Sequence, residues 1–158
     1  MGWYKPVIIV VMNRLEKRLS KELKSVPYPT TFHTENYTWV VETKLPSIGS
    51  VVLYIPCDYP FRPPRVKING ASYDDFLRLW SPRFRFRYHT MFGNRCLCAC
   101  HSSILSSEKW YPGYRLIDVL HDMKKLHHDK CLVAYSLFVE QIKERHRLPD
   151  DIDILSFL

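Results

Sequence analysis

Three prolines within six residues constrain the fold of this chain more than any other feature. They lie in the segment Tyr59-Pro60-Phe61-Arg62-Pro63-Pro64. Because a proline has no backbone N–H to donate to a neighbouring strand, this segment cannot be a central strand of a sheet. It therefore connects two parts of the fold.

The residues before these prolines predict one helix followed by antiparallel strands. From Ile8 to Val26 apolar residues recur every three or four positions, which is typical of an amphipathic helix. The segment Val26-Pro27-Tyr28-Pro29 ends this helix, since each proline disfavours helical geometry in its predecessor. Three strands rich in β-branched and aromatic residues should follow as a meander, at Thr30 to Glu35, Tyr37 to Leu45 and Val51 to Ile55.

The residues after the prolines predict a short strand from Arg65 to Ile68 and then a less regular region. Arginines alternate with aromatic residues from Pro82 to Tyr88, which is typical of a half-buried strand. Apolar periodicity predicts one helix from Leu116 to Met123 and another from Leu132 to Ile142, and Leu148-Pro149-Asp150-Asp151 looks like the start of a short terminal helix. The order of helix, strands, irregular segment and helices predicts an α+β fold.

Composition favours one domain over residues 1 to 158, because 46% hydrophobic residues can build one substantial core. The longest apolar run, Val7 to Met12, is far shorter than the ~20 residues of a membrane span, and it lacks the cleavage pattern of a signal peptide. The five cysteines are odd in number and three are crowded into Cys96-Leu97-Cys98-Ala99-Cys100. We therefore expect reduced thiols in an intracellular protein, cytoplasmic or nuclear.

The proline-rich hexapeptide resembles the signature YPF(K/R)PP of the ubiquitin-conjugating enzymes, where a short strand follows it. That family then has a glycine, two residues, the active cysteine and a leucine, which matches Gly93-Asn94-Arg95-Cys96-Leu97. A tryptophan, one residue and a proline precede its next helix, which matches Trp110-Tyr111-Pro112, and Asp129 matches an acidic residue near the end of that helix. The resemblance implies a UBC-like fold: an N-terminal helix, an antiparallel strand meander, an irregular active-site segment and C-terminal helices.

The chain departs from the family pattern in three places. The gate-like loop between the second and third strands is shortened to Pro46-Ser47-Ile48-Gly49-Ser50, and the His-Pro-Asn motif is replaced by His89-Thr90-Met91. The segment between Cys96 and Trp110 is also longer than in common members. The resemblance is therefore to a divergent member, of the kind found among large DNA viruses.

The resemblance assigns Cys96 as the residue that carries ubiquitin, or a ubiquitin-like protein, as a thioester. A thiol with an ordinary pKa of about 8.5 is strongly nucleophilic at neutral pH even though little of it is ionised. The resemblance implies that an asparagine stabilises charge on the carbonyl oxygen, and Met91 cannot donate a hydrogen bond in its place. Asn94 is a candidate substitute because it would share a face with Cys96 in an extended chain. The alternative is a turn asparagine after Gly93.

Two further polar residues are candidates for a catalytic role. The imidazole of His101 can deprotonate an incoming amine or orient the thiol; its alternative is a solvated histidine in a surface loop. The family's acidic group at the position of Asp129 helps steer or deprotonate the substrate lysine, and the alternative is an exposed carboxylate at a helix end.

The neighbouring cysteines raise two other possibilities. Cys98 and Cys100 would share a face with Cys96 in an extended segment, but the Gly-x-x-Cys-Leu pattern selects Cys96, and the other two can pack as small apolar residues. Cys96, Cys98, Cys100, His101 and His89 include suitable ligands for zinc. Their spacing lacks the two-residue gaps of structural zinc sites, which favours the thiol interpretation.

The resemblance also implies partner surfaces. The basic face of the first helix, with Arg14, Lys17 and Arg18, is where the family meets its activating enzyme, although charged residues on a solvated face are common. Ubiquitin ligases grip positions that correspond to Phe61 and Pro112, while Phe61 could instead close the core. The further partners would be ubiquitin and a protein substrate. No cofactor is expected, because the activating enzyme uses the ATP, and no membrane partner is expected.

Two other functions compete with this interpretation. The loss of the asparagine at Met91 and the short gate loop favour a catalytically inactive, UBC-like adaptor or structural protein. The net charge of +7 and a strand face with Arg83, Arg85 and Arg87 favour a nucleic-acid-binding module. Nucleic acid is the less expected partner, because aromatic residues on the opposite strand face cannot stack on the same ligand.

Overall fold

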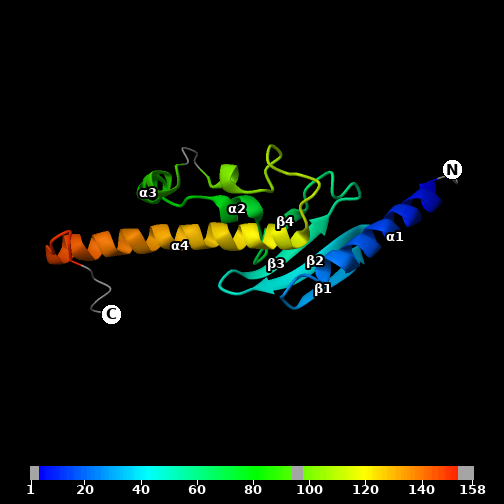
Figure 1. The fold of residues 1–158 in the computed structure, drawn as a ribbon, viewed down its shortest axis with the longest axis horizontal. Helices are drawn as coiled ribbons and strands as arrows, with labels where there is room; N and C mark the ends of the chain where they lie inside the picture. The colour runs from blue at the N-terminus through cyan, green and yellow to red at the C-terminus, as the bar shows by residue number, and fades with distance from the viewer. Residues whose placement is uncertain (1–3, 94–97, 153–158) are drawn as a thin grey trace.

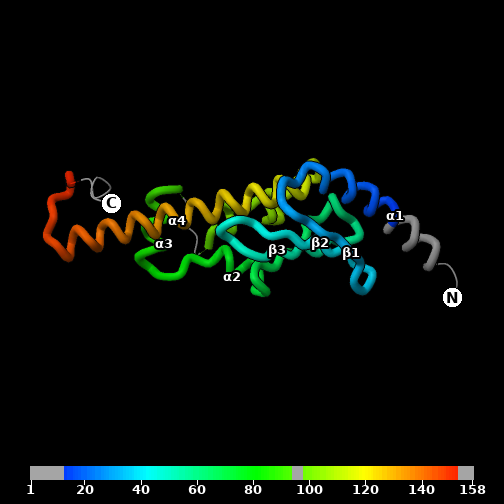
Figure 2. The backbone as a smooth tube through the Cα atoms, turned by 90° about the horizontal axis from the view of Figure 1, so that it is seen from below, coloured from blue at the N-terminus to red at the C-terminus, as the bar shows by residue number. Residues whose placement is uncertain are grey.

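A computed structural model describes residues 4–93 and 98–152, with side chains from residue 13 onward. The molecule is elongated, and the helix α4 (Leu116–His146) runs along its long axis. A sheet and the helix α1 (Tyr4–Leu23) lie at one end, and the helix α3 (Pro82–Phe92) lies beside the other half of α4 (Figure 1, Figure 2). The two parts are called here the sheet end and the helical end.

The sheet end follows the sequence prediction closely. Five antiparallel strands lie in the order β1-β2-β3-β4-β5, so the predicted α+β class and strand meander are confirmed. The first helix ends at Leu23 rather than Val26, because the chain turns where Ser25 and Val26 donate back to the helix. The strand bounds are β1 Thr30–Glu35, β2 Thr38–Leu45, β3 Gly49–Ile55, β4 Arg65–Ile68 and β5 Ala71–Ser72.

One face of the sheet forms the core at this end. Alternate residues of β2 and β3 point to the two helices, so that Val41 and Leu53 pair across the strands and are both buried. Leu19 of α1 and Leu120 of α4 pack against the same cluster. The two helices and the sheet therefore form two layers around one apolar interior.

The turn before β3 requires a glycine. Gly49 has φ +112°, and a Cβ atom there would lie 2.2 Å from Oδ1 of Asn69. That asparagine accepts from Ser50 N at 2.9 Å and donates to Ile48 O at 2.8 Å. The short connection is thus held by a side chain from the β4–β5 turn.

The two helices predicted after residue 115 are one continuous helix, and the prediction of two was wrong. Polar residues between Met123 and Leu132 interrupted the apolar pattern, but no glycine or proline lies within Leu116–His146. Leu126, Lys130 and Val133 continue the buried face at helical spacing. The hydrogen-bonded helix therefore passes through this polar stretch without a break.

The predicted strand from Pro82 to Tyr88 was also wrong, since these residues form most of α3. Ser81 caps the helix by accepting from Phe84 N at 3.1 Å, and Gly93 ends it in the left-handed conformation with φ +69°. Phe84 and Tyr88, four residues apart, are the buried pair. The conformation of this segment is therefore determined by its helix caps and not by the alternation of arginines and aromatic residues.

The helical conformation also changes the role of the arginines. Arg83 and Arg87 point to α4, where both donate to Glu140, at 2.9 and 2.7 Å, and Arg83 also approaches Glu144 at 3.3 Å. Arg85 lies on another side of α3 and lines a different pocket. The expected face of three parallel arginines is therefore not formed.

Other differences from the prediction are smaller. The sequence analysis missed the short helix α2 (Tyr73–Leu77), although Ser72 caps it by accepting from Asp75 N. Residues 149–152 form a turn, and the rest of the predicted terminal helix lies outside the described residues. Among the helices that are described, none is long and apolar enough to cross a membrane.

Candidate functional site

The proline-rich segment is fixed to the core through Tyr59. Its ring is buried, and its hydroxyl donates to Oε2 of Glu22 on α1 at 2.8 Å. The Tyr59–Pro60 peptide is cis. Burial and the neighbouring carboxylate of Glu22 raise the pKa of Tyr59 above its ordinary value. The hydroxyl therefore stays protonated and remains a donor.

Glu22 joins three elements of the fold. Besides the hydroxyl of Tyr59, its carboxylate accepts from Arg18 Nε at 2.7 Å and from the backbone N of Leu116 at 3.0 Å. Leu116 is the first residue of α4, so the carboxylate lies at the positive end of that helix. These contacts fix the starting point of α4 relative to α1 and Tyr59.

The Trp110-Tyr111-Pro112 segment lies against the proline-rich segment. Nε1 of Trp110 donates to the carbonyl oxygen of Pro60 at 2.7 Å, and its ring lies 6.3 Å from that of Tyr59. Next to this contact the side chain of Phe61 is 78% exposed, and Pro112 is half-buried. The alternative that Phe61 closes the core is therefore wrong.

The proposed nucleophile, Cys96, and its neighbour Asn94 lie outside the described residues. The chain leaves α3 at Gly93 and is described again from Cys98, which forms an isolated β-bridge with Arg78. Ala99 is then buried and donates to Leu77 O at 2.9 Å. The segment that contains Cys96 is thus bounded by two fixed points.

Cys98 and Cys100 form a disulfide in this structure. The prediction that the crowded thiols are reduced, or pack as small apolar residues, was wrong for this pair. Local geometry brings the sulfurs together, because Cys100 begins a 3₁₀ turn (Cys100–Ser102) instead of continuing an extended strand. Within the described ranges, no three His, Cys, Asp or Glu residues are grouped as a metal site would require.

The segment after the cysteines is anchored to α4 by Asp122. Its Oδ2 accepts from Ser103 Oγ at 3.0 Å and from Ile104 N at 3.1 Å. The hydroxyls of Ser103 and Tyr73 lie 2.9 Å apart, which adds α2 to the network. Burial raises the pKa of the Asp122 carboxyl, against the opposing effect of these donors. The long loop is therefore bound at its middle, a contact that the sequence analysis missed.

His101 and Asp129 occupy different surroundings. His101 is exposed, and its backbone oxygen accepts from Nζ of Lys109. Asp129 lies in the middle of α4, is 6% exposed and accepts from Lys125 Nζ at 2.7 Å. The alternative of an exposed carboxylate at a helix end was wrong, because Asp129 is buried and α4 continues to His146, nearly five turns further on. The hydrogen bond to Asp129 raises the pKa of Lys125.

The other predicted residues lie on two surfaces. Arg14 and Lys17 of α1 are exposed, whereas Arg18 is half-buried between Glu22 and the ring of Tyr59, 5.0 Å from its centroid. Arg18 thus has a structural role. Met91 is 42% exposed in the last turn of α3.

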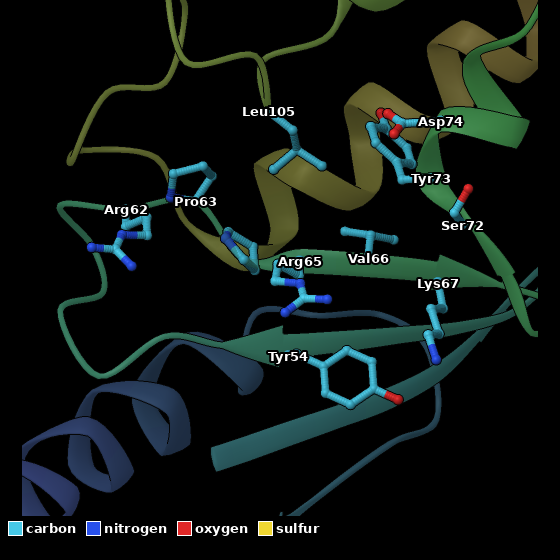
Figure 3. A pocket seen from close by; sticks show the side chains of 11 residues that line it. Tyr54, Arg62, Pro63, Arg65, Val66, Lys67, Ser72, Tyr73, Asp74 and Leu105 are labelled. Atoms are coloured by element: carbon cyan, nitrogen blue, oxygen red, sulfur yellow. The ribbon is translucent and has the colours of Figure 1, made fainter.

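A groove of about 430 Å³ separates the proline-rich segment from the anchored loop (Figure 3). Val66 of β4 faces Leu105 and Tyr73, while Lys67 points to the other side of the strand, with its Nζ 5.7 Å from the centre of the Tyr54 ring. The groove is therefore lined by both apolar and charged side chains, the charged ones being Arg62, Arg65, Lys67 and Asp74.

No family model, no curated protein and no solved structure matches this chain.

Proposed function

We propose that this protein is a divergent ubiquitin-conjugating enzyme with a UBC-like fold. It accepts ubiquitin, or a ubiquitin-like protein, from an activating enzyme as a thioester on Cys96. It then passes the modifier to a substrate lysine or to a ligase, in the cytoplasm or nucleus. ATP is used by the activating enzyme, and this chain binds no cofactor.

One observation carries the proposal. The two segments that resemble the family, Tyr59–Pro64 and Trp110–Pro112, are far apart in the sequence but are joined by the hydrogen bond from Trp110 Nε1 to Pro60 O. Glu22 then ties the first of these segments to the start of the following helix. Such a framework would hold the C-terminal side of the cysteine-containing region in place, and the hydrogen bond from Ala99 N to Leu77 O holds the chain just after Cys98, as thioester transfer requires.

The exposed side chains supply a set of partner contacts. Arg14 and Lys17 are accessible on the basic helix face, as are Lys21 and Lys24, and such a face suits an acidic surface on the activating enzyme. Phe61 follows Pro60, whose carbonyl oxygen binds Trp110, and it would serve as an exposed aromatic anchor for a ligase. Arg18 is left out of this set because it is engaged with Glu22.

The test of the proposal is thioester formation. The protein is incubated with activating enzyme, ATP and ubiquitin, and then run on gels with and without reductant. We expect an upward shift by one ubiquitin that reductant removes. The Cys96→Ala variant should lose it, and the matched variant Cys57→Ala, at an exposed free cysteine, should keep it.

A negative result has a defined meaning. If neither ubiquitin nor any ubiquitin-like protein is transferred by a folded protein, the enzyme proposal is wrong. The UBC-like adaptor then becomes the better interpretation, which the loss of the asparagine at Met91 also favours. Binding to nucleic acid has less support, since Arg83 and Arg87 are engaged with Glu140.

The ligase contact has a separate test. Phe61→Ala should leave thioester formation unchanged and reduce ligase-stimulated discharge of ubiquitin about tenfold or more, as expected for loss of an aromatic hot spot. Phe86→Ala is the matched control, because Phe86 is 74% exposed on α3, away from this surface. Equal discharge rates for the two variants would contradict the assignment of Phe61.

A further inference from the structure

A second pocket lies beside the Cys98–Cys100 disulfide, at the helical end of the molecule. Its volume is about 580 Å³, and both half-buried cysteines line it. The buried side chains of Leu77 and Leu79 contribute apolar walls, and the Trp80 side chain, 69% exposed, also lines it. The disulfide is therefore open to a small molecule that enters this pocket.

The charged groups around the pocket form a specific pattern. Two guanidinium groups, from Arg78 and Arg85, and one carboxylate, from Asp74, line it. Arg78 makes a loose ion pair with Asp75, 3.6 Å apart, and both side chains are more than half exposed. Nε of Arg85 is buried and has no hydrogen-bond partner among the described residues. The site thus offers donors for carboxylates and one acceptor for an ammonium group.

We infer that this pocket is a thiol–disulfide exchange site for a small peptide thiol that carries two carboxylates and an ammonium group, as glutathione does. The two arginines match the carboxylates, and Asp74 matches the ammonium group. Trp80 and the leucines contact the uncharged part of the peptide. The thiol of the ligand then approaches the protein disulfide.

The exchange takes place in two successive steps. The ligand thiol loses its proton to water, and the thiolate attacks one protein sulfur, which breaks the Cys98–Cys100 bond and releases the other cysteine as a thiolate. A second ligand thiolate then attacks the mixed disulfide. This frees the remaining cysteine and forms the oxidised dimer of the ligand, so that two ligand thiols are oxidised and one protein disulfide is reduced. Both protein thiolates then take up protons from water according to pH.

The structure also indicates which sulfur is attacked and which one leaves. The backbone N–H of Cys100 donates to Sγ of Cys98 across 3.4 Å. A hydrogen bond of this kind stabilises a thiolate, and a stabilised thiolate leaves faster. Cys98 is therefore the leaving group, and the mixed disulfide forms on Cys100.

The test compares glutathione with its diethyl ester, in which both carboxylates are blocked. The unreduced full-length protein is mixed with each thiol at low salt, samples are quenched with acid and alkylated, and the disulfide is followed by mass. We expect glutathione, per thiolate, to reduce the disulfide about 3- to 10-fold faster than the ester. The ratio of the glutathione rate to the ester rate should fall towards one in Arg78→Gln and in Arg85→Gln. It should be unchanged in Arg145→Gln, which replaces an exposed arginine on α4. Fragment masses should place the trapped glutathione on Cys100.

Three results would overturn the inference. The first is an unreduced protein with both thiols free. The second is an equal rate for the two reagents, or a preference that both pocket variants retain while remaining folded by circular dichroism. The third is trapped glutathione mainly on Cys98, which would refute the assignment of the attacked sulfur. Because none of these measurements involves ubiquitin, their outcome is independent of the proposed transferase activity.

Discussion

The two ends of the molecule each bury a charged residue, but they stabilise it differently. At the sheet end, Glu22 accepts hydrogen bonds from Arg18, Tyr59 and the start of α4. At the helical end, Lys130 is 5% exposed, donates to Phe76 O and lies near the rings of Phe76 and Trp80, with Nζ 5.0 and 5.2 Å from their centroids. No carboxylate is bonded to its ammonium among the described residues.

The comparison shows that a buried charge can stabilise the fold by joining elements, or can destabilise it when it has no opposite charge. The carboxylate of Glu22 links three separate segments, so its removal leaves several donors unsatisfied. The ammonium of Lys130 lacks an opposite charge, and burial lowers its pKa to about 8. We therefore expect the sheet end to lose stability when its charge is removed and the helical end to gain it.

The largest effect is expected for Glu22→Ala. Loss of a buried ionic partner that holds three donors should lower the free energy of unfolding by about 3–5 kcal/mol. Urea unfolding at pH 7 measures this change. Glu16→Ala, an exposed residue on the same helix, is the matched control and should be nearly neutral. A loss below about 1 kcal/mol for Glu22→Ala would show that the three contacts do not act together.

An increase in the free energy of unfolding is expected for Lys130→Met. At pH 7 the lysine is protonated in both the folded and the unfolded chain, so the folded state bears the full cost of burial. The variant should therefore raise the free energy of unfolding by about 1–3 kcal/mol.

This advantage should depend on pH in a defined direction. As the pH rises above about 8, Lys130 loses its proton in the folded protein but keeps it in the unfolded chain, whose lysines titrate near 10.5. The wild type then gains stability, and the difference between wild type and Lys130→Met shrinks up to pH 9.5. Lys124→Met, at an exposed lysine of the same helix, should not show this trend. A constant difference across this range would mean that Lys130 is not titrating.

A smaller loss is expected for Trp110→Phe. The substitution removes the donor to Pro60 O while it keeps an aromatic ring, so the free energy of unfolding should fall by about 0.5–1.5 kcal/mol. Trp80→Phe is the matched control at the helical end, where the indole is 69% exposed. Equal values for the two variants would contradict the view that Trp110 fixes the proline-rich segment.

The smallest effect is expected for Arg87→Gln. Its ion pair with Glu140 lies at the surface of the helical end, with side chains 31% and 38% exposed, where water and salt weaken the attraction. A double-mutant cycle with Glu140→Gln should give a coupling near the limit of detection at 0.5 M salt. A strong coupling that survives salt would show that the α3–α4 contact is more than a surface pair.

The same two ends differ in how much of the fold was predictable from the sequence. At the sheet end, the β-branched residues are typical of strands and the prolines mark where helix and strands end. No competing pattern is present there, so the strand meander was predicted. At the helical end, Arg83 to Tyr88 fits a period of two, yet Ser81 and Gly93 provide helix caps on either side. The caps fix both ends of α3 and bring Phe84 and Tyr88 to one face, which the alternation alone could not reveal.

The candidate site was predictable in part for a similar reason. The motif residues Phe61 and Trp110 could be selected from the sequence, but their spatial relation depends on Glu22, whose partners are 37 and 94 residues away. Asp122 shows the same limit, since a carboxylate on a helix gives no sign that it will bind a loop. Long-range hydrogen bonds of this kind leave no local pattern.

The unbroken course of α4 gives the protein a fixed internal length. Its 31 residues, at 1.5 Å each, extend about 46 Å. Glu22 fixes where the helix starts, and the buried side chains of Phe84 and Tyr88 from α3 pack against its far half. The surface near the first turn of α4 and the surface near Glu144 in its last turn are therefore held at a fixed separation by a single rigid element.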